Sequence, residues 1–335
     1  MPSRPNALII GMIVAVLGLA AVTSGLLAGV WTVFYVGLSF VNVGSAATIA
    51  AGVTGVTLLT VGYLEYRQIG TIERIADAKR VGRDTEPAVY DVVTRVAAQL
   101  NVPVPTIAIS ERQAPEALAV GFRPENIHLV LSRGTLDALD GTLELEAVIA
   151  HELAHVKNRD AMVMTLVSLP VLLAGGLKSR LAEMENPGWM VAIIIPLSVI
   201  ATSVWIIGKA ITARLSRVRE QAADRVAAEV TGSPAAVASA LKQLDEDIAE
   251  TPARDLREAS GISSLSILPL EPAELEKVML GPEGTKEPSY WWLEQRLHRV
   301  ERWLFRTHPL TEDRIERLST AEREQEQQGG PTVQS

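Results

Sequence analysis

The sequence predicts a mainly α-helical protein that crosses a membrane four times and also contains a small antiparallel β-sheet. The first observation is the run from Pro5 to Leu64, which has no charged side chain, although a transmembrane helix needs only about 20 apolar residues. The second is a pair of further apolar runs, Ala161–Leu177 and Trp189–Gly208. The third is a group of short apolar or β-branched runs between turn residues, which is typical of strands.

The first apolar run is long enough for two crossings. We place them at Ala7–Val36 and Leu38–Leu64, joined by a short turn near Val36–Ser45. A cleaved signal peptide is the alternative, because Arg4 precedes an apolar stretch with small residues. The apolar part of such a peptide spans only about 7–15 residues, whereas this run does not stop there.

The third and fourth crossings use shorter runs. Ala161–Leu177 is at the lower length limit for a span and contains Pro170, while Trp189–Gly208 has full length and contains Pro196. Either run could be a core helix of a soluble domain. Their closeness to the histidine motif described below favours the membrane.

Basic side chains indicate the orientation. They precede the first crossing and follow the second and fourth: Arg4; Arg67, Arg74, Lys79, Arg80 and Arg83; Lys209, Arg214, Arg217 and Arg219. Because positive residues beside short spans stay in the cytoplasm, these segments are predicted to be inside and the loop Lys178–Asn186 outside.

Composition limits the chemistry and the partners. The net charge of -8 belongs to the parts outside the apolar runs, and an acidic surface does not suit nucleic acid. The chain has no cysteine, so disulfides and thiolate ligands are excluded. Any metal site must therefore use histidine and carboxylate side chains.

The segment before the histidine motif predicts one helix and the sheet. Apolar residues recur every three or four positions over Pro87–Leu100, which indicates an amphipathic helix. Thr106–Ser110, Ala117–Phe122 and Ile127–Ser132 are predicted to form the antiparallel sheet. Thr142 is the expected N-cap of the helix that follows.

The part after the fourth crossing is partly helical. Leu215–Val230 is rich in alanine and predicted helical, and Ser233 followed by Pro234 marks the start of another helix. Thr251–Pro288 is rich in proline and glycine, and we hypothesise that it is a lid over a cleft. Ser319–Ser335 is polar, rich in Gln and Glu, and predicted to be disordered.

The stretch EAVIAHELAHVKNRD, Glu146–Asp160, contains two of the five histidines in the chain. On a helix, His151 and His155 lie on one face one turn apart, so their ring nitrogens can meet at one point. Glu152 projects from the adjacent edge, where a carboxylate can take a proton from a water activated by zinc. The H-E-x-x-H pattern therefore predicts half of a tetrahedral zinc site beside a general base.

A catalytic zinc needs a third protein ligand and an open fourth position. Glu220 and Asp224 are four residues apart on one helical face, so one is predicted to bind the metal and the other to orient a ligand histidine. Two apolar runs separate His155 from Glu220, an even number of crossings. Both helices therefore return to the same membrane face, whereas one crossing would part them by about 30 Å.

HELAH followed by R-E-x-x-x-D resembles the M48 family of membrane zinc metallopeptidases, and the order of the spans is most similar to the HtpX-type heat-shock proteases. The resemblance covers nearly the whole chain. It implies a cytoplasmic zincin-like metalloprotease domain with one zinc ion on His151, His155 and Glu220. It also implies Glu152 as the general base and Asp224 as the support of a ligand histidine.

This interpretation divides the chain into five parts. They are two transmembrane helices at 1–64, a cytoplasmic protease part with the HExxH helix at 65–160, a transmembrane hairpin at 161–208, a second cytoplasmic protease part with the third ligand at 209–318, and a disordered tail at 319–335.

THPLTEDRIERL, Thr307–Leu318, is similar to the C-terminal T-H-P segment of the family. The resemblance implies that His308 and Arg314 act near the substrate carbonyl as donors to the oxyanion. Without the family, His308 would more often be a surface or packed histidine and Arg314 a solvated helical charge.

One departure from the family lies upstream of HExxH, where the family commonly has N-A-F-A-T-G and this chain has EALAVG. Glu116 replaces an asparagine that can donate a hydrogen bond, which an ionised carboxylate cannot do. Either Glu116 points away or support of the oxyanion falls to His308. An extended substrate is expected to pair with the backbone of the next four residues, Ala117, Leu118, Ala119 and Val120.

The expected protein is a multi-pass zinc endopeptidase of the cell membrane that cleaves misfolded or damaged membrane proteins at the cytoplasmic face, in protein quality control. One rival is a non-catalytic membrane scaffold with a structural metal, but such a site needs no base like Glu152. Another is a prenylated-peptide protease, although those relatives have more spans. An ion-conducting role is weaker still, because the apolar runs contain no charge to mark a pathway.

Overall fold

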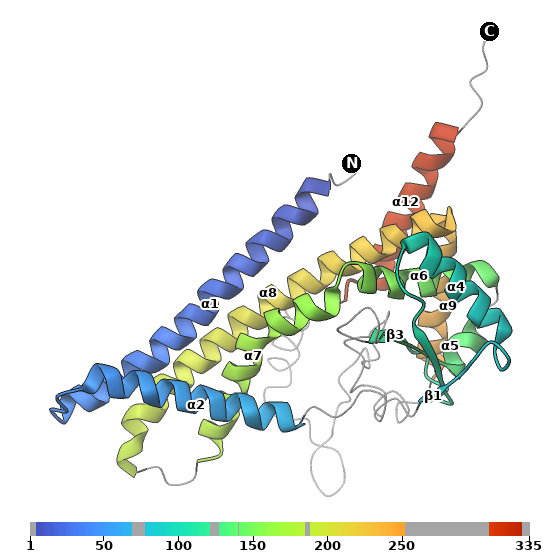
Figure 1. Ribbon diagram of the computed structural model, residues 1–335. Helices are drawn as coiled ribbons and strands as arrows, with labels where there is room; N and C mark the ends of the chain where they lie inside the picture. The colour runs from blue at the N-terminus through green and yellow to red at the C-terminus, as the bar shows by residue number, and fades with distance from the viewer. Residues whose placement is uncertain are drawn as a thin grey trace, which may run out of the picture. The chain divides into compact units, whose positions relative to one another are not determined.

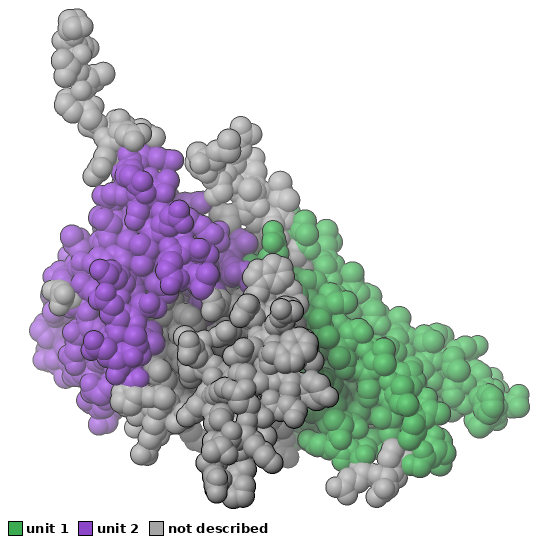
Figure 2. All heavy atoms as spheres, turned by 180° about the vertical axis from the view of Figure 1, so that it is seen from behind, with its two compact units in different colours: residues 1–70, 163–216 green, residues 71–162, 217–335 purple. Residues whose placement is uncertain are grey.

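The computed structural model describes residues 5–68, 78–120, 127–139, 141–184, 188–251 and 308–329, and over these the chain is mainly helical (Figure 1). It divides into two compact units (Figure 2). Unit 1 is Met1–Gly70 with Val163–Ser216, and unit 2 is Thr71–Met162 with Arg217–Ser335. The boundaries of these units fall after residues 70, 162 and 216, and the five-part division at 64, 160, 208 and 318 stays a prediction.

Four helices are long and apolar enough to cross a membrane, which confirms the predicted number over the described residues. They are α1 (Pro5–Phe40), α2 (Ala46–Gln68), α7 (Asp160–Ala182) and α8 (Val191–Thr231). A three-residue 3₁₀-helix, η2 (Gly188–Met190), precedes α8.

The helix ends differ from those predicted. Asn42 adopts a left-handed φ of 56° just after α1, and such a residue commonly ends a helix, so the turn occupies only residues 41–45. Helix α7 continues to Ala182, so Lys178 and Arg180 lie in a helix and not in a loop. Helix α8 is uninterrupted, which joins the predicted fourth span and the predicted helix at Leu215–Val230 into one element.

Glycines allow close approach of helices within unit 1. A Cβ added at Gly29 of α1 would lie 2.9 Å from Ile200 Cγ2 of α8, and one at Gly208 of α8 would lie 2.8 Å from Val171 Cγ2 of α7. Small residues at such crossings are what packing between membrane helices requires. The buried apolar residues of this bundle include Leu26, Val30, Ala174, Leu197 and Ala201.

Unit 2 contains a four-stranded sheet in the order β1-β2-β4-β3. Its strands are β1 (Ala78–Arg80), β2 (Thr106–Ser110), β3 (Ala117–Val120) and β4 (His128–Ser132). β2 pairs with β4 in parallel and the other two pairings are antiparallel. The prediction of a purely antiparallel sheet was therefore wrong: β4 inserts between β2 and β3, and two reversals of the chain make it parallel to β2.

Helices cover one face of this sheet. α4 (Pro87–Leu100) has the predicted bounds, and α9 (Pro234–Glu250) starts as predicted, with the Ser233 side chain accepting a hydrogen bond from Ala236 N. The short α5 (Arg133–Ala138) follows β4 directly. Together with α6 (Thr142–Lys157) and α9, α4 packs on a core that includes Ile107, Ala117, Leu129 and Leu131 of the sheet. The opposite face carries a smaller cluster of Ala108, Leu118 and Val130.

The C-terminal part corrects another prediction. Helix α12 runs over Thr311–Gly329, so 319–329 is helical where 319–335 was predicted to be disordered. Leu318 is buried against the core of unit 2, and Glu322 accepts a hydrogen bond of 2.9 Å from Ala235 N at the start of α9. These contacts stabilise a sequence whose composition alone favours disorder. The segment hypothesised to be a lid, 251–288, falls outside the described residues except for its first residue.

Candidate active site

Helix α6 places its polar motif in the interior of unit 2. Its N-cap is Gly141 and not the predicted Thr142. Glu144 lies in its first turn, where the helix dipole favours a negative charge. Its residues 146–154 are buried without interruption. His151 and Glu152 therefore stand in a dry environment, where each polar atom needs a partner.

Three side chains from two helices converge as the sequence predicted. The Nε2 atoms of His151 and His155 lie 3.2 Å apart. From α8, Glu220 places Oε2 3.4 Å from His151 Nε2 and Oε1 3.6 Å from His155 Nε2. One ligand atom from each residue lies within 4.8 Å of the other two, and this is the group in the described chain that could hold a metal ion.

A carboxylate and an arginine stand behind the first histidine. Asp224, one turn after Glu220 on α8, places Oδ1 3.0 Å from His151 Nδ1. Arg314 of α12 donates from Nε to Asp224 Oδ2 at 2.8 Å and from Nη2 to Oδ1. The guanidinium fork thus holds the carboxylate, which lies beside Nδ1 of the imidazole.

The electrostatics of the histidines fit a cation. Burial lowers the pKa of His151, but the neighbouring carboxylates of Asp224 and Glu220 outweigh it and raise the pKa to about 9. Burial lowers the pKa of His155, which keeps that imidazole neutral, the form that binds metals. The carboxylates thus favour one positive charge at His151 Nε2, which a metal ion can supply in place of the proton.

A carboxylate oxygen of Glu220 also indicates a bound cation. Glu220 Oε2 is buried and has no hydrogen-bond donor among the described residues, since His151 Nε2 at 3.4 Å and His308 Nδ1 at 3.5 Å form no well-shaped hydrogen bond with it. A buried carboxylate oxygen without a partner is costly. Coordination to a cation would satisfy it, so the donor set of two imidazoles and one carboxylate fits a divalent metal ion.

Glu152 lies next to this donor set and contacts the sheet. Its Oε2 accepts a hydrogen bond of 3.0 Å from Ala119 N of β3, while its Oε1 is buried with no partner among the described residues. Burial raises the pKa of Glu152 to about 8, and a divalent cation close by would lower it again. The side chain therefore has one anchored oxygen and one oxygen available for proton transfer.

The pairing of β3 shows which backbone groups are left for a partner. Ser132 N donates to the Glu116 carbonyl at 2.8 Å, so residues 116, 118 and 120 direct their backbone groups toward β4. By alternation, Ala117 and Ala119 direct theirs toward the edge of the sheet that no described strand covers, called the open edge below. Ala119 N, which Glu152 engages, belongs to that edge.

Glu116 points away from the metal-binding group. It lies two positions before Leu118, which belongs to the sheet face opposite α6, and alternate residues of a strand share a face. Its buried carboxylate lies 3.2 and 3.3 Å from Arg112 Nη1. Its backbone is tied to β4 and α5 by Ser132 and Thr135, so this residue anchors the strand.

His308 and Arg314 occupy different places. His308 is buried with Nδ1 3.5 Å from Glu220 Oε2, beside the metal-binding group. Arg314 instead has Nε and Nη2 on Asp224, behind His151. The structure therefore brings all seven predicted polar residues together, but it puts Arg314 on a supporting carboxylate and not at an open position.

Sequence reasoning missed two residues of this cluster. Asp160 Oδ2 lies 2.7 Å from His155 Nδ1 and 2.9 Å from Arg219 Nε. Asp160 follows the second motif histidine by five residues, outside the three- and four-residue spacing of one helical face. Arg219 directly precedes Glu220 and was assigned to membrane orientation. The available signal was the opposite charge of Asp160, just after the HExxH segment, and Arg219, just before Glu220, which could have indicated an ion pair between the two segments.

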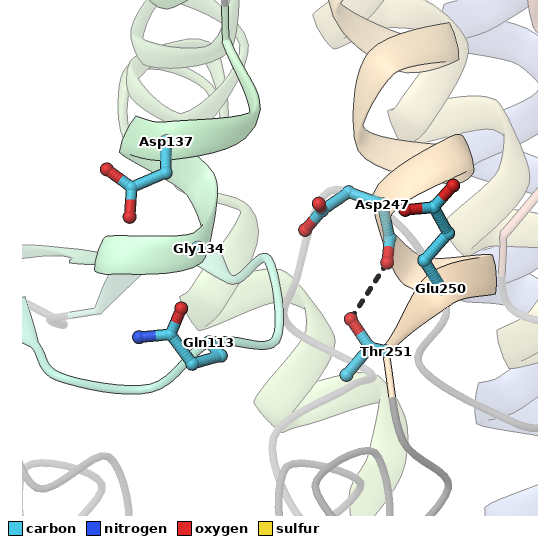
Figure 3. Close-up of a pocket in the computed structure, with 6 residues that line it drawn as sticks. All are labelled: Gln113, Gly134, Asp137, Asp247, Glu250 and Thr251. Atoms are coloured by element: carbon cyan, nitrogen blue, oxygen red, sulfur yellow. Dashed lines mark hydrogen bonds between the residues drawn. The ribbon is translucent and has the colours of Figure 1, made fainter.

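A pocket elsewhere in unit 2 takes no part in this cluster. It has a volume of about 240 Å³ and is lined by Gln113, Gly134, Asp137, Asp247, Glu250 and Thr251. Figure 3 shows its acidic side chains coming from α5 and from the end of α9. None of its lining residues belongs to the metal-binding group.

Four membrane-capable helices and a buried HExxH helix that shares a metal-binding group with a glutamate define a membrane metallopeptidase. The sequence pattern of Peptidase family M48 matches residues 83–322. The chain belongs to the M48 family, with the HtpX-type proteases as its relatives.

Two such relatives show the extent of the similarity. "Protease HtpX homolog 1" of Streptomyces coelicolor is 34% identical over 281 residues, covering 81% of this chain and 90% of that protein. "Protease HtpX homolog" of Moorella thermoacetica is 33% identical over 264 residues, covering 75% and 77%. The crystal structure of S. mikatae Ste24p overlaps with a TM-score of 0.43 at 14% identity, covering 93% of this chain and 66% of that one.

The position of Arg314 predicts a stability effect. Arg314→Gln leaves Asp224 buried beside His151 without its guanidinium, and loss of one partner of a buried ion pair costs about 3–5 kcal/mol of unfolding free energy. Arg314→Lys should not restore it, because an ammonium cannot form the two-pronged contact. Chemical denaturation of the metal-free protein in detergent measures both variants.

Arg83 provides the matched control. It pairs with Asp91 at 3.1 Å, but the two side chains are 70% and 58% exposed, so Arg83→Gln should cost less than about 1 kcal/mol. Equal losses for Arg314→Gln and Arg83→Gln would show that Arg314 does not hold Asp224.

Proposed function

We propose that this protein is a membrane-embedded zinc endopeptidase that cleaves misfolded or damaged membrane proteins at the cytoplasmic face of the cell membrane. The observation that supports it most is the placement of Glu152, which has an anchored oxygen and a buried free oxygen beside the His151, His155 and Glu220 group. A structural metal site would have no use for such a carboxylate.

The residues that would hold zinc are His151, His155 and Glu220. Two imidazoles and one carboxylate are a ligand set of catalytic zinc sites, in which the fourth position stays open. When bound there, zinc supplies a Lewis acid that polarises the scissile carbonyl and lowers the pKa of water. Without cysteine in the chain, no thiolate competes for the ion.

Glu152 acts as the general base in this proposal. Its Oε2 stays on Ala119 N, which fixes the carboxylate, and its Oε1 takes a proton from the attacking water. The same carboxyl group then delivers a proton to the leaving amine as the peptide bond breaks. Burial favours this second step, because it raises the affinity of the group for a proton.

The substrate would lie along the open edge of β3. Of the predicted substrate strand Ala117–Val120, the outward backbone groups are those of Ala117 and Ala119. Because Glu152 occupies Ala119 N, an extended peptide would pair with the N–H and carbonyl of Ala117 and with the carbonyl of Ala119 as an added strand. Leu118 and Val120 serve the pairing with β4 instead. Strand addition of this kind recognises the substrate through its backbone and not through its side chains, which suits unfolded polypeptides of varied sequence.

His308 is the proposed donor to the developing oxyanion. It is buried beside Glu220 and its ring nitrogens have no hydrogen-bond partner among the described residues, and a poised donor of this kind stabilises negative charge in a transition state. Glu116 cannot take the role because its carboxylate lies on Arg112. We assign Arg314 to positioning Asp224 and through it His151.

The first test compares the wild type with Glu152→Gln. Glutamine keeps the shape and can still accept from Ala119 N, but it is not a base, so zinc content should stay at about one per chain while cleavage falls about 10²–10⁴-fold. Elemental analysis of the detergent-purified proteins and cleavage of an unfolded protein such as casein measure the two quantities.

Glu220→Gln is the companion variant, which should lose zinc as well as activity. If the wild type holds zinc but cleaves none of several unfolded substrates, the protein is a membrane scaffold with a structural metal and not a protease.

The membrane orientation is tested with single cysteines, since the chain has none of its own. With unit 2 in the cytoplasm, Gly44→Cys in the α1–α2 turn and Met184→Cys after α7 should react with a membrane-impermeant maleimide in right-side-out vesicles. Asp84→Cys, before α4, should react only in inside-out vesicles. Labelling of Asp84→Cys from the outside would reverse the proposed topology.

A further inference from the structure

The second metal-ligand histidine has its own carboxylate. His155 Nδ1 lies 2.7 Å from Asp160 Oδ2, and Asp160 is 2% exposed. At this length the proton lies between a ring nitrogen and an acceptor, so Nδ1–H donates to the carboxylate. The lone pair of Nε2 is then directed to the other side, where His151 Nε2 lies at 3.2 Å and Glu220 Oε1 at 3.6 Å.

An arginine holds that carboxylate. Arg219 Nε lies 2.9 Å from Asp160 Oδ2, while its Nη2 lies 3.4 Å from His155 Nδ1. The contact with Asp160 is an ion pair by distance and charge, since Arg219 Nε has no hydrogen-bond partner of good geometry among the described residues. Arg219 directly precedes Glu220 in α8, so one ion pair joins the segment after the HExxH helix to the residue next to the third ligand.

The backbone brings Asp160 to this place by an uncommon conformation. Arg159, between α6 and α7, adopts a left-handed φ of 55°, which costs a non-glycine residue about 1–2 kcal/mol. Such a conformation persists where surrounding contacts determine it. Arg159 directly precedes Asp160, the first residue of α7, whose carboxylate contacts His155 in the last turn of α6.

We propose that Asp160 is a positioning residue for the metal: held by Arg219, it fixes the tautomer and the direction of His155 so that Nε2 is presented to the ion. The arrangement matches the set on the other ligand, where Arg314 holds Asp224 and Asp224 contacts His151. Each ligand histidine thus has a carboxylate beside its Nδ1, and each carboxylate is paired with an arginine. This inference rests on the proposed zinc site.

The test measures zinc affinity of the full-length protein in detergent by competition with a chelator. Asp160→Asn keeps an oxygen acceptor but loses the charge, and Asp160→Leu loses both. Loss of such a supporting partner weakens metal binding about 10–100-fold, so we expect the zinc dissociation constant to rise about tenfold for the first variant and about 100-fold for the second.

Glu146→Gln is the matched control. Glu146 lies on the same helix as His151 and His155, is also buried, and pairs with Arg95 at 2.9 Å, but no contact joins it to a ligand histidine in the described structure. Its zinc affinity should stay within about threefold of the wild type. The absorption spectrum of the cobalt-substituted protein, which reports ligand geometry, should change in the Asp160 variants and not in Glu146→Gln.

The outcomes separate this inference from the proposed function. Wild-type zinc affinity and an unchanged cobalt spectrum in both Asp160 variants would overturn the inference, and so would an equal loss of affinity in Glu146→Gln, which would mark a general effect of removing a buried ion pair. A wild-type protein that binds no zinc would instead overturn the proposed function itself.

Discussion

The need to neutralise ionisable groups inside a dry helical core governs the rest of this structure. His151, Glu152 and Glu220 are each less than 5% exposed, and burying such groups unpaired would cost several kcal/mol each. The fold meets this requirement with interlocked pairs contributed by α6, α8 and α12. Their convergence makes three distant segments of the chain depend on one another.

The pairing of buried charges also explains why the side chains of the metal-binding group are oriented before a metal binds. Carboxylates placed behind the imidazoles hold them in fixed directions and favour positive charge between them. Metal ligands that are oriented in advance lose little freedom on binding. Helix α8 contributes Glu220 and Asp224 from its C-terminal part, so a helix that begins as an apolar span also carries the proposed third metal ligand and its neighbouring carboxylate.

Much of this site could be predicted because it follows helical spacing. His151 with His155 and Glu220 with Asp224 are pairs four residues apart, and such pairs lie on one helical face whatever the rest of the fold does. The composition of the apolar runs predicted the four membrane-capable helices for a similarly local reason. Asp160 escaped prediction because the left-handed Arg159 brings it to His155, and no periodic pattern contains such a turn.

The features that sequence reasoning missed depend on tertiary contacts. The short apolar and β-branched runs in 106–132 indicated strands but not their order, so the sequence did not predict the parallel pairing of β2 and β4. The helical state of 319–329 depends on contacts of α12 with α9, and the composition of that segment predicts disorder. The resemblance to the family implied that Arg314 donates to the oxyanion, whereas in the structure its guanidinium donates to Asp224.

The central claim is that His151, His155 and Glu220 hold the catalytic metal, and zinc K-edge X-ray absorption of the zinc-loaded, detergent-purified protein tests it most directly. The account predicts two imidazole nitrogens at about 2.0–2.1 Å, with oxygen in the remaining positions. His155→Ala should reduce the imidazole count to one in whatever zinc remains bound. A spectrum with one imidazole or none in the wild type would contradict the account.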